Sequence, residues 1–167
     1  MNKHDFFDII MTKCAWSKQG NDEKVLAPLI KFLSQQEDDE IFMFKDIMTD
    51  LLYQLDTLQN FKIAKRYYHH NADTFLYSRC VALINGEKYY INVKQGKNKD
   101  LWTKEFESLL YVPKRAWKMK HHKSLEYYPH LPAISYETGS NKDGWEKRIS
   151  LTRLKRIIQN KSIKNFM

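Results

Sequence analysis

Residues 38–58, DDEIFMFKDIMTDLLYQLDTL, decide the fold. Apolar side chains recur in this stretch every three or four residues, which is the spacing of one face of an α-helix. They are Ile41, Phe44, Met48, Leu51, Leu52 and Leu55. An acidic cluster lies at the start of the stretch, where a helix N-terminus favours negative charge. The pattern therefore predicts a long central helix with a continuous apolar stripe.

The same spacing recurs on both sides of this helix. It predicts shorter helices over residues 6–14, 60–69 and 75–85, the last of them with Asp73 or Thr74 as its N-cap. A further helix within residues 23–34 is expected to begin near Ala27, because proline is suited only to a first helical turn and Pro28 follows.

The C-terminal third combines helical and irregular patterns. Residues 101–117 predict a long helix bent at Pro113, and residues 148–160 predict a basic amphipathic helix. Between them, residues 121–145 contain two prolines and two glycines and are expected to wrap over the helices as an irregular segment.

Residues 79–94, RCVALINGEKYYINVK, admit two interpretations. The β-branched and aromatic residues could form a hairpin around Asn85 and Gly86, which would make the fold α+β. An isolated hairpin is only marginally stable, and no third strand is evident, so we favour a short helix. The fold class expected is all-α, an irregular bundle of about six to eight helices in one domain with a wrapped C-terminal segment.

Size and composition exclude several classes of protein. The chain has 167 residues, of which 43% are hydrophobic and 29% charged, as in one globular domain and unlike a disordered or low-complexity chain. We expect a single domain over residues 1–167 whose tail frays after about residue 160. No apolar run is long enough for a membrane span, no secretory signal is evident, and the two cysteines suit a reducing compartment. We therefore expect a cytoplasmic protein.

The net charge of +8 is unevenly distributed along the chain. Residues 1–60 contain 6 Lys and Arg against 11 Asp and Glu, whereas residues 61–167 contain 22 against 9. If the two parts occupy different faces of the fold, one face attracts basic partners and the other attracts phosphates or acidic proteins. If the two parts interleave, much of this asymmetry cancels.

Arg79 and Glu107 each lie among apolar residues of an expected helix. A buried charge costs several kcal/mol unless it is paired. We therefore predict that these two residues meet in a structural ion pair. An anion-binding role for Arg79 is the alternative.

No pattern in the chain indicates catalysis, a metal or a cofactor. The histidine pairs 69–70 and 121–122 are adjacent in sequence, whereas a zinc site needs i, i+4 spacing or a Cys/His set. Phosphate-binding glycine loops and nucleophile motifs are missing from the sequence. We expect a protein that binds and does not catalyse.

Basic residues alternate with aromatic ones in residues 114–128, and residues 148–164 are again basic. Cations can reach phosphates while aromatic rings stack on bases, so this half of the chain could bind single-stranded nucleic acid. The residues of this alternative are Trp117, Lys118, Lys120, Tyr127, Arg153 and Arg156.

Five strings in chain order resemble a family of small bacterial helical domains of unknown function. They are HDFFDII, DEIFMFKDIMTDLLYQLD, DTFLYSRCVALINGEKYY, EFESLLYVPKRAW and SNKDGWEK, which together cover residues 4–147. The family pattern of an aspartate-rich turn before a Phe-x-Tyr-Phe-Arg stretch is matched by Asn71, Ala72, Asp73, Phe75, Tyr77 and Arg79, with Ser78 replacing an aromatic residue and one acidic position missing. Members occur alone, near polymorphic toxin genes, or beside WGR modules in proteins described as molybdate-metabolism regulators.

The resemblance implies a helical fold and an immunity protein, which neutralises a cognate bacterial toxin domain as in contact-dependent growth inhibition. The expected partner is the C-terminal nuclease domain of such a toxin. Because a nuclease cleft is basic, an inhibitor would present carboxylates to it. The acidic candidates are Glu37, Asp38, Asp39 and Glu40, and the candidate aromatic anchors are Tyr136 and Trp145.

Overall fold

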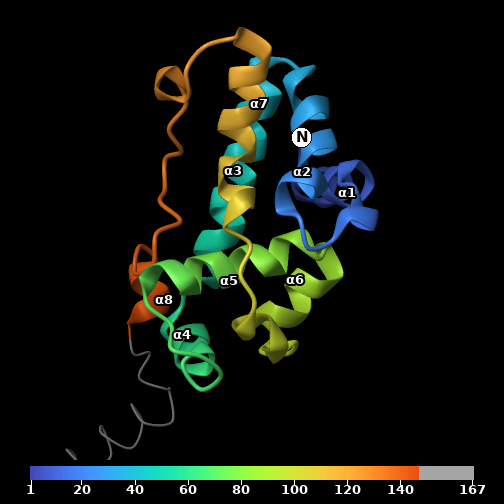
Figure 1. The fold of residues 1–167 in the computed structure, drawn as a ribbon. Helices are drawn as coiled ribbons and strands as arrows, with labels where there is room; N and C mark the ends of the chain where they lie inside the picture. Colours follow the sequence, from blue (N-terminus) through green and yellow to red (C-terminus); the bar gives the residue numbers. More distant parts are fainter. Residues whose placement is uncertain (147–167) are drawn as a thin grey trace, which may run out of the picture.

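The computed structural model describes residues 1–146, which form eight α-helices and four short 3-10 helices (Figure 1). The α-helices are α1 (Lys3–Lys13), α2 (Asp22–Ser34), α3 (Asp38–Leu55), α4 (Leu58–Ala64), α5 (Ala72–Ile84), α6 (Glu87–Lys94), α7 (Val112–His121) and α8 (Lys142–Trp145). The 3-10 helices are η1 (Trp16–Lys18), η2 (Lys99–Thr103), η3 (Glu107–Tyr111) and η4 (Leu125–Tyr127). The described residues contain no strand, so the predicted all-α fold is confirmed.

Polar side chains determine where several helices begin. The side chains of Asn2, Asn21, Thr57 and Asn71 each accept a hydrogen bond from a backbone N–H in the first turn of the helix that follows. Such N-caps satisfy donors that a helix leaves unpaired at its start. Asn71 caps α5 in place of the predicted Asp73 or Thr74, so this helix begins earlier than predicted, at Ala72.

The cap of α5 gives a first testable prediction. Asn71 accepts from Thr74 N at 2.8 Å, and Thr74 Oγ1 accepts from Asn71 N at 3.0 Å, which completes a capping box. We expect Asn71→Ala to lower the free energy of unfolding by about 1 kcal/mol, the usual effect of losing a cap. Urea unfolding measures this loss. Asn71→Asp keeps the acceptor, so equal destabilisation by both substitutions would contradict the capping role.

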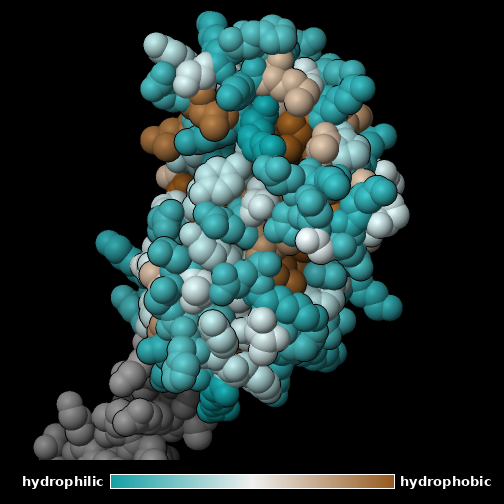
Figure 2. Space-filling model, viewed as in Figure 1, coloured by the Kyte–Doolittle hydropathy of each residue, from teal (hydrophilic) through white to brown (hydrophobic). Residues whose placement is uncertain are grey.

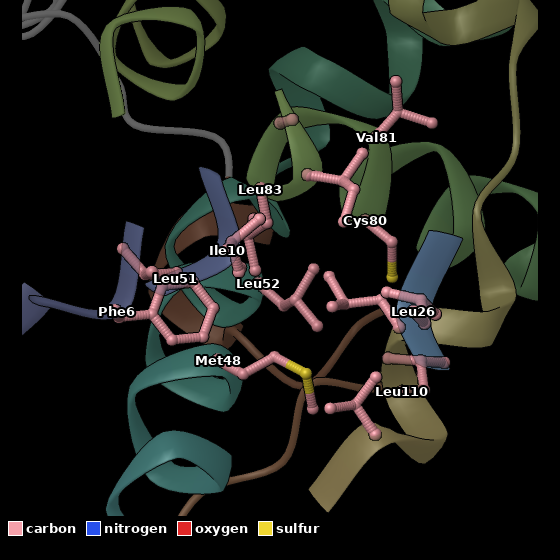
Figure 3. Packing of buried hydrophobic residues seen from close by; sticks show 14 of the residues in the cluster. Phe6, Ile10, Leu26, Met48, Leu51, Leu52, Cys80, Val81, Leu83 and Leu110 are labelled. Atoms are coloured by element: carbon pink, nitrogen blue, oxygen red, sulfur yellow. The ribbon is translucent and has the colours of Figure 1, made fainter. Parts of the chain in front are cut away.

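The core forms where α3 meets α1, α2, α5 and α7 (Figure 1). Every residue of the apolar stripe predicted in α3 is buried. Figure 3 shows Met48, Leu51 and Leu52 of this helix facing side chains from the N-terminal helices and from α5, among them Phe6, Leu26 and Cys80. The fold-deciding stretch is therefore the centre of the bundle.

Residues 87–94 form helix α6, so the short helix favoured over a hairpin is confirmed. Gly86 separates it from α5 with a φ of +87°, a backbone conformation that glycine adopts at no steric cost. The break lets α6 fold back against α5, with Tyr90 and Val93 buried. Apolar residues at helical spacing thus bury one face without any sheet.

Several other helix boundaries differ from the prediction, and α4, expected over residues 60–69, ends at Ala64. Helix α2 begins at Asp22 and contains Pro28 in its interior, where the buried Val25 and Leu26 hold the preceding turn against the core. The long helix expected over residues 101–117 is divided into η2, η3 and α7. Pro113 lies in the first turn of α7, because proline lacks the N–H that a helix interior requires.

The wrapped C-terminal segment is present as residues 122–141, here called the strap. Its chain leaves the end of α7, runs beside α3 and reaches α8 (Figure 1). Figure 2 shows a mostly hydrophilic surface with hydrophobic side chains gathered near the upper part of the strap. Leu131 is 88% exposed and Ile134 42% exposed there. The predicted helix over residues 148–160 lies outside the described residues.

The same described part of the chain has no helix that combines the length and the apolar character needed to cross a membrane.

Candidate functional site

The predicted ion pair between Arg79 and Glu107 does not form among the described residues. Arg79 is fully buried, and its guanidinium donates to Leu52 O at 2.8 Å and, on the strap, to Tyr136 O and Thr138 Oγ1, each at 3.0 Å. Glu107 accepts from the hydroxyl of Tyr111 at 2.7 Å. The prediction was wrong because helix α5 turns Arg79 toward the C-terminal end of α3, away from η3.

Asp56 is the second fully buried charge and also holds the strap. Its carboxylate accepts from Gly139 N at 2.9 Å, Asn141 N at 3.1 Å and Trp145 Nε1 at 2.8 Å. Burial lowers the pKa of Arg79 to about 10, and the charge of Asp56 opposes this shift. The two groups therefore hold one polar cluster that fixes the strap to α3 and α5.

Tyr136 and Trp145, the expected aromatic anchors for a toxin, are used inside the molecule. Trp145 donates to Asp56 and packs on Phe61 with ring centroids 5.1 Å apart. Tyr136 is half-buried, and Lys45 Nζ lies 4.4 Å from the centre of its ring. Neither ring projects freely as a binding anchor would, because the strap places both against the bundle.

The acidic cluster at the start of α3 is partly neutralised. Asp38 accepts from Lys120 Nζ at 2.8 Å and lies 2.9 Å from His121 Nε2, and these partners lower the pKa of its carboxyl against the opposing effect of burial. Glu40 lies 3.5 Å from the N-terminal amine. Glu37 and Asp39 remain exposed, with no ion pair within residues 1–146. Only half of the predicted cluster is therefore free to contact a partner.

The residues predicted to bind single-stranded nucleic acid are likewise only partly free to contact a partner. Trp117 is only 5% exposed and cannot stack on a base, and Lys120 is held by Asp38 and by Gln36 O. Lys118 and Tyr127 are exposed. Arg153 and Arg156 lie outside the described residues.

The acidic and basic parts of the chain interleave. Helix α7 from the basic part packs against α2 and α3 from the acidic part (Figure 1). An ion pair crosses this boundary between Arg115 and Glu23 at 3.6 Å, and His130 Nε2 lies 2.7 Å from Asp46 Oδ1. The sequence asymmetry is therefore only partly retained as separate charged faces.

A hollow with a volume of about 930 Å³ lies on the surface between α2 and α7. Apolar and basic side chains together line this α2–α7 groove, and we call its basic residues the rim. Apolar or aromatic side chains in it are Ala27, Ile30, Tyr111, Met119 and Leu125. The cationic or titratable groups along it are Arg115, Lys118, His122 and Lys123, against the single carboxylate of Glu23.

Exposed apolar side chains distinguish this groove from an ordinary solvated face. Tyr111 is 46% exposed and Met119 47% exposed. Of the groove residues, only Lys118 was predicted individually from the sequence as a binding residue, whereas Arg115, Met119 and Lys123 were not. The amphipathic pattern of α7 could have identified Met119. The buried face of this helix contains Ala116 and Trp117, and Met119 lies outside that face.

No three His, Cys, Asp or Glu side chains gather as a metal site would require in the part of the chain that the structure describes. The histidines serve other contacts. His70 Nε2 lies 2.7 Å from Trp102 O, and His121 and His130 contact Asp38 and Asp46 of α3. The candidate site is therefore the α2–α7 groove, a surface suited to binding.

Comparison with known proteins gives one match. A family model described as a protein of unknown function (DUF4240) matches residues 1–119, which include helices α1–α6 and most of α7. No curated protein matches the chain, and no solved structure matches it. The link to immunity proteins and to WGR modules stays a prediction.

Proposed function

The chain belongs to DUF4240, a family of proteins of unknown function, and we propose that it acts by binding another protein, as an immunity protein that neutralises a cognate bacterial toxin domain. The α2–α7 groove is the proposed contact surface, and the proposed occupant is an acidic segment of that toxin. Neutralisation then needs tight binding and no reaction.

The observation that carries this proposal is the composition of the groove. Its lining exposes Met119 and Tyr111 and includes Arg115 and Lys118. Aromatic residues, Met and Arg are enriched at protein interfaces, where they supply most of the binding energy. A groove of this kind supports protein recognition more directly than catalysis.

The charge of the rim supports an acidic partner. Lys118 and Lys123 have no ion pair within residues 1–146, so their charges are available to carboxylates. Complementary charges steer association and set specificity. By contrast, the acidic cluster retains only Glu37 and Asp39 for a basic cleft. We therefore propose contact with an acidic segment in place of mimicry of a nucleic acid.

A nucleic-acid-binding role is the second candidate, and one observation favours it. Tyr127 is 66% exposed and is the last residue of η4, close in the chain to Lys118 and Lys123. Bases can stack on such a ring while lysines contact phosphates. The burial of Trp117 removes the second stacking ring, so this candidate has weaker support.

Reversing the rim charges tests the proposal. We expect the double substitution Lys118→Glu and Lys123→Glu to weaken binding of the toxin domain encoded by the neighbouring gene about tenfold or more, which is at least about 1.4 kcal/mol. Calorimetry measures the affinity, and survival of cells that express the toxin measures protection. Binding by the unmodified protein should weaken as salt is raised, because salt screens exposed charges.

Two matched variants separate the alternatives. The pair Lys62→Glu and Lys88→Glu makes the same charge change on exposed residues of α4 and α6 and should leave binding intact. The pair Glu37→Lys and Asp39→Lys removes the free part of the acidic cluster and should also leave binding intact. Loss of binding with the second pair would instead support acidic mimicry. Salt-dependent affinity for single-stranded DNA, lost with the rim reversal, would favour the nucleic-acid role.

A further inference from the structure

A second hollow lies between α3 and the strap, away from the α2–α7 groove. Its volume is about 500 Å³, within the range of small-molecule sites. Lys45 and Thr49 of α3, Lys114 of α7 and strap residues 128–137 line it. We call it the strap cavity. None of its residues lines the α2–α7 groove.

Lys45 is a buried amine on the wall of this cavity. The residue is only 5% exposed, and within residues 1–146 its Nζ has no hydrogen bond and no ion pair. Its one close favourable contact is the face of Tyr136, 4.4 Å from the ring centre. Removing an ammonium group from water costs several kcal/mol unless an anion or polar groups replace the water. The cavity therefore holds a cation whose counter-ion the described chain does not supply.

Two hydroxyl groups in the same cavity are also without partners. Thr49 Oγ1 and Tyr128 Oη are buried and make no hydrogen bond among the described residues. Thr49 follows Lys45 by four residues on α3, so the two side chains lie on one face of the helix. Because buried polar groups in folded proteins nearly always have partners, two unpartnered hydroxyl groups beside a lysine with no ion pair indicate a ligand.

The charged and titratable groups around Lys45 come from four elements. Burial lowers the pKa of Lys45 to about 8, Lys114 adds to this effect, and negative charge nearby opposes it. The groups that face Lys45 are Asp46 on α3, Cys80 on α5, Lys114 on α7, and Tyr128, His130, Tyr136 and Glu137 on the strap.

We propose that the strap cavity binds a small organic carboxylate, with Lys45 as its counter-ion and the hydroxyl groups of Thr49 and Tyr128 as hydrogen-bond donors. One buried cation matches one negative charge. Lys114 also lines the cavity and Glu137 offsets its charge, so the lining carries about one net positive charge, which matches a monoanion better than a phosphate dianion.

The other residues that line the strap cavity indicate the chemical character of the rest of the ligand. The strap contributes apolar surface from Pro129, Leu131, Pro132, Ala133 and Ile134. Apolar walls with a few polar groups are typical of sites for small organic molecules. The ligand is therefore a monocarboxylate with an apolar body, held between α3 and the strap.

Binding of simple probes tests this site. Acetate, hexanoate and benzoate are titrated into the full chain at millimolar concentrations and followed by NMR shifts of strap residues. We expect saturable binding of hexanoate or benzoate, and at least tenfold weaker binding of the neutral benzamide. No saturable shift with any of the three carboxylates would overturn the proposal. Preferential binding of inorganic phosphate would also overturn it.

Three variants separate a binding role for Lys45 from a structural role. Lys45→Met keeps the length of the side chain, and we expect it to lose carboxylate binding at least tenfold while raising the urea midpoint of the free protein, since it removes an unpaired buried charge. Thr49→Val should weaken binding severalfold. Lys62→Met, an exposed control on α4, should change neither. If Lys45→Met destabilises the protein and leaves binding intact, Lys45 is structural.

The pH dependence of binding gives an independent readout. Lys45 is charged below its pKa of about 8 and neutral above it, so carboxylate affinity should be constant near pH 7 and fall as pH rises toward 9.5. The bound anion stabilises the charged amine, so binding above pH 8 should be accompanied by proton uptake. An affinity that does not change between pH 7 and 9.5 would contradict the role of Lys45.

Discussion

Substitution of Asp56 by alanine is expected to lower the free energy of unfolding by about 3–5 kcal/mol, the range for removing one partner from a buried charged cluster. The substitution leaves Gly139 N, Asn141 N and Trp145 Nε1 without their acceptor. It also leaves the buried Arg79 without the negative charge that favours its charged form. A domain of this kind is stable by only about 5–15 kcal/mol, so this is a large part of the total.

The loss should begin in the strap. Asp56 contacts residues 139–145, whereas the helices keep their own apolar contacts, so the strap should detach before the bundle unfolds. Urea unfolding measures the total loss, and hydrogen exchange of strap amides measures the local one. Asp8→Ala, at an exposed carboxylate, should change stability by less than about 0.5 kcal/mol and serves as the control.

A second variant tests whether Arg79 and Asp56 act together. Arg79 and Asp56 hold neighbouring parts of the strap, so the effects of Arg79→Met and Asp56→Asn should not add, with a coupling of about 0.5–3 kcal/mol in a double-mutant cycle. Additive effects would mean that the two charges hold the strap independently.

Sequence reasoning located the importance of Arg79 but not its partners. A charge among apolar residues of a helix predicts burial, and Arg79 is fully buried. The partners are carbonyl groups and a hydroxyl on α3 and the strap, and no spacing rule relates residues 52, 79 and 136 along the chain. The position of Asp56 could have predicted that it has partners. A carboxylate at the C-terminal end of a helix is unfavourable unless other groups stabilise it.

The candidate binding residues, too, could be predicted only in part from the sequence. The basic part of the chain was recognised, yet the outcome for Trp117 and Lys118 depended on which side of α7 each occupies. Trp117 lies on the buried side and Lys118 on the exposed side. The role of Lys45 could not be predicted, because a lysine on the polar side of α3 looks solvated until the strap covers it.

The fold was more predictable because helix periodicity is local. The apolar stripe of α3 and the preference for a helix at residues 87–94 follow from spacing alone. The division of residues 101–117 into η2, η3 and α7 does not, since short 3-10 turns can present apolar residues at intervals that resemble those of one helix. What the sequence could not determine was which segments the long central helix would contact.

The apolar stripe of α3 predicts that two phenylalanines of this helix contribute unequally to stability. Phe44 is fully buried, and its ring lies 4.6 Å from that of Phe6. Phe42, two residues earlier, is half-buried and stacks on His130 of the strap at 4.7 Å. We expect Phe44→Ala to cost about 3–5 kcal/mol of unfolding free energy and Phe42→Ala about 1 kcal/mol.

These two substitutions remove the same atoms from the same helix, so intrinsic helix preference cannot explain a difference between them. Only the side of α3 on which each ring lies can do so. Urea unfolding of both variants measures the difference, and Phe42→Ala should in addition loosen the upper strap, where its ring stacks on His130. Equal losses would mean that residues 38–58 do not form the centre of the bundle. If Phe44→Ala lowers the free energy of unfolding without changing the hydrogen exchange of strap amides, α3 contacts the core and the strap through opposite faces.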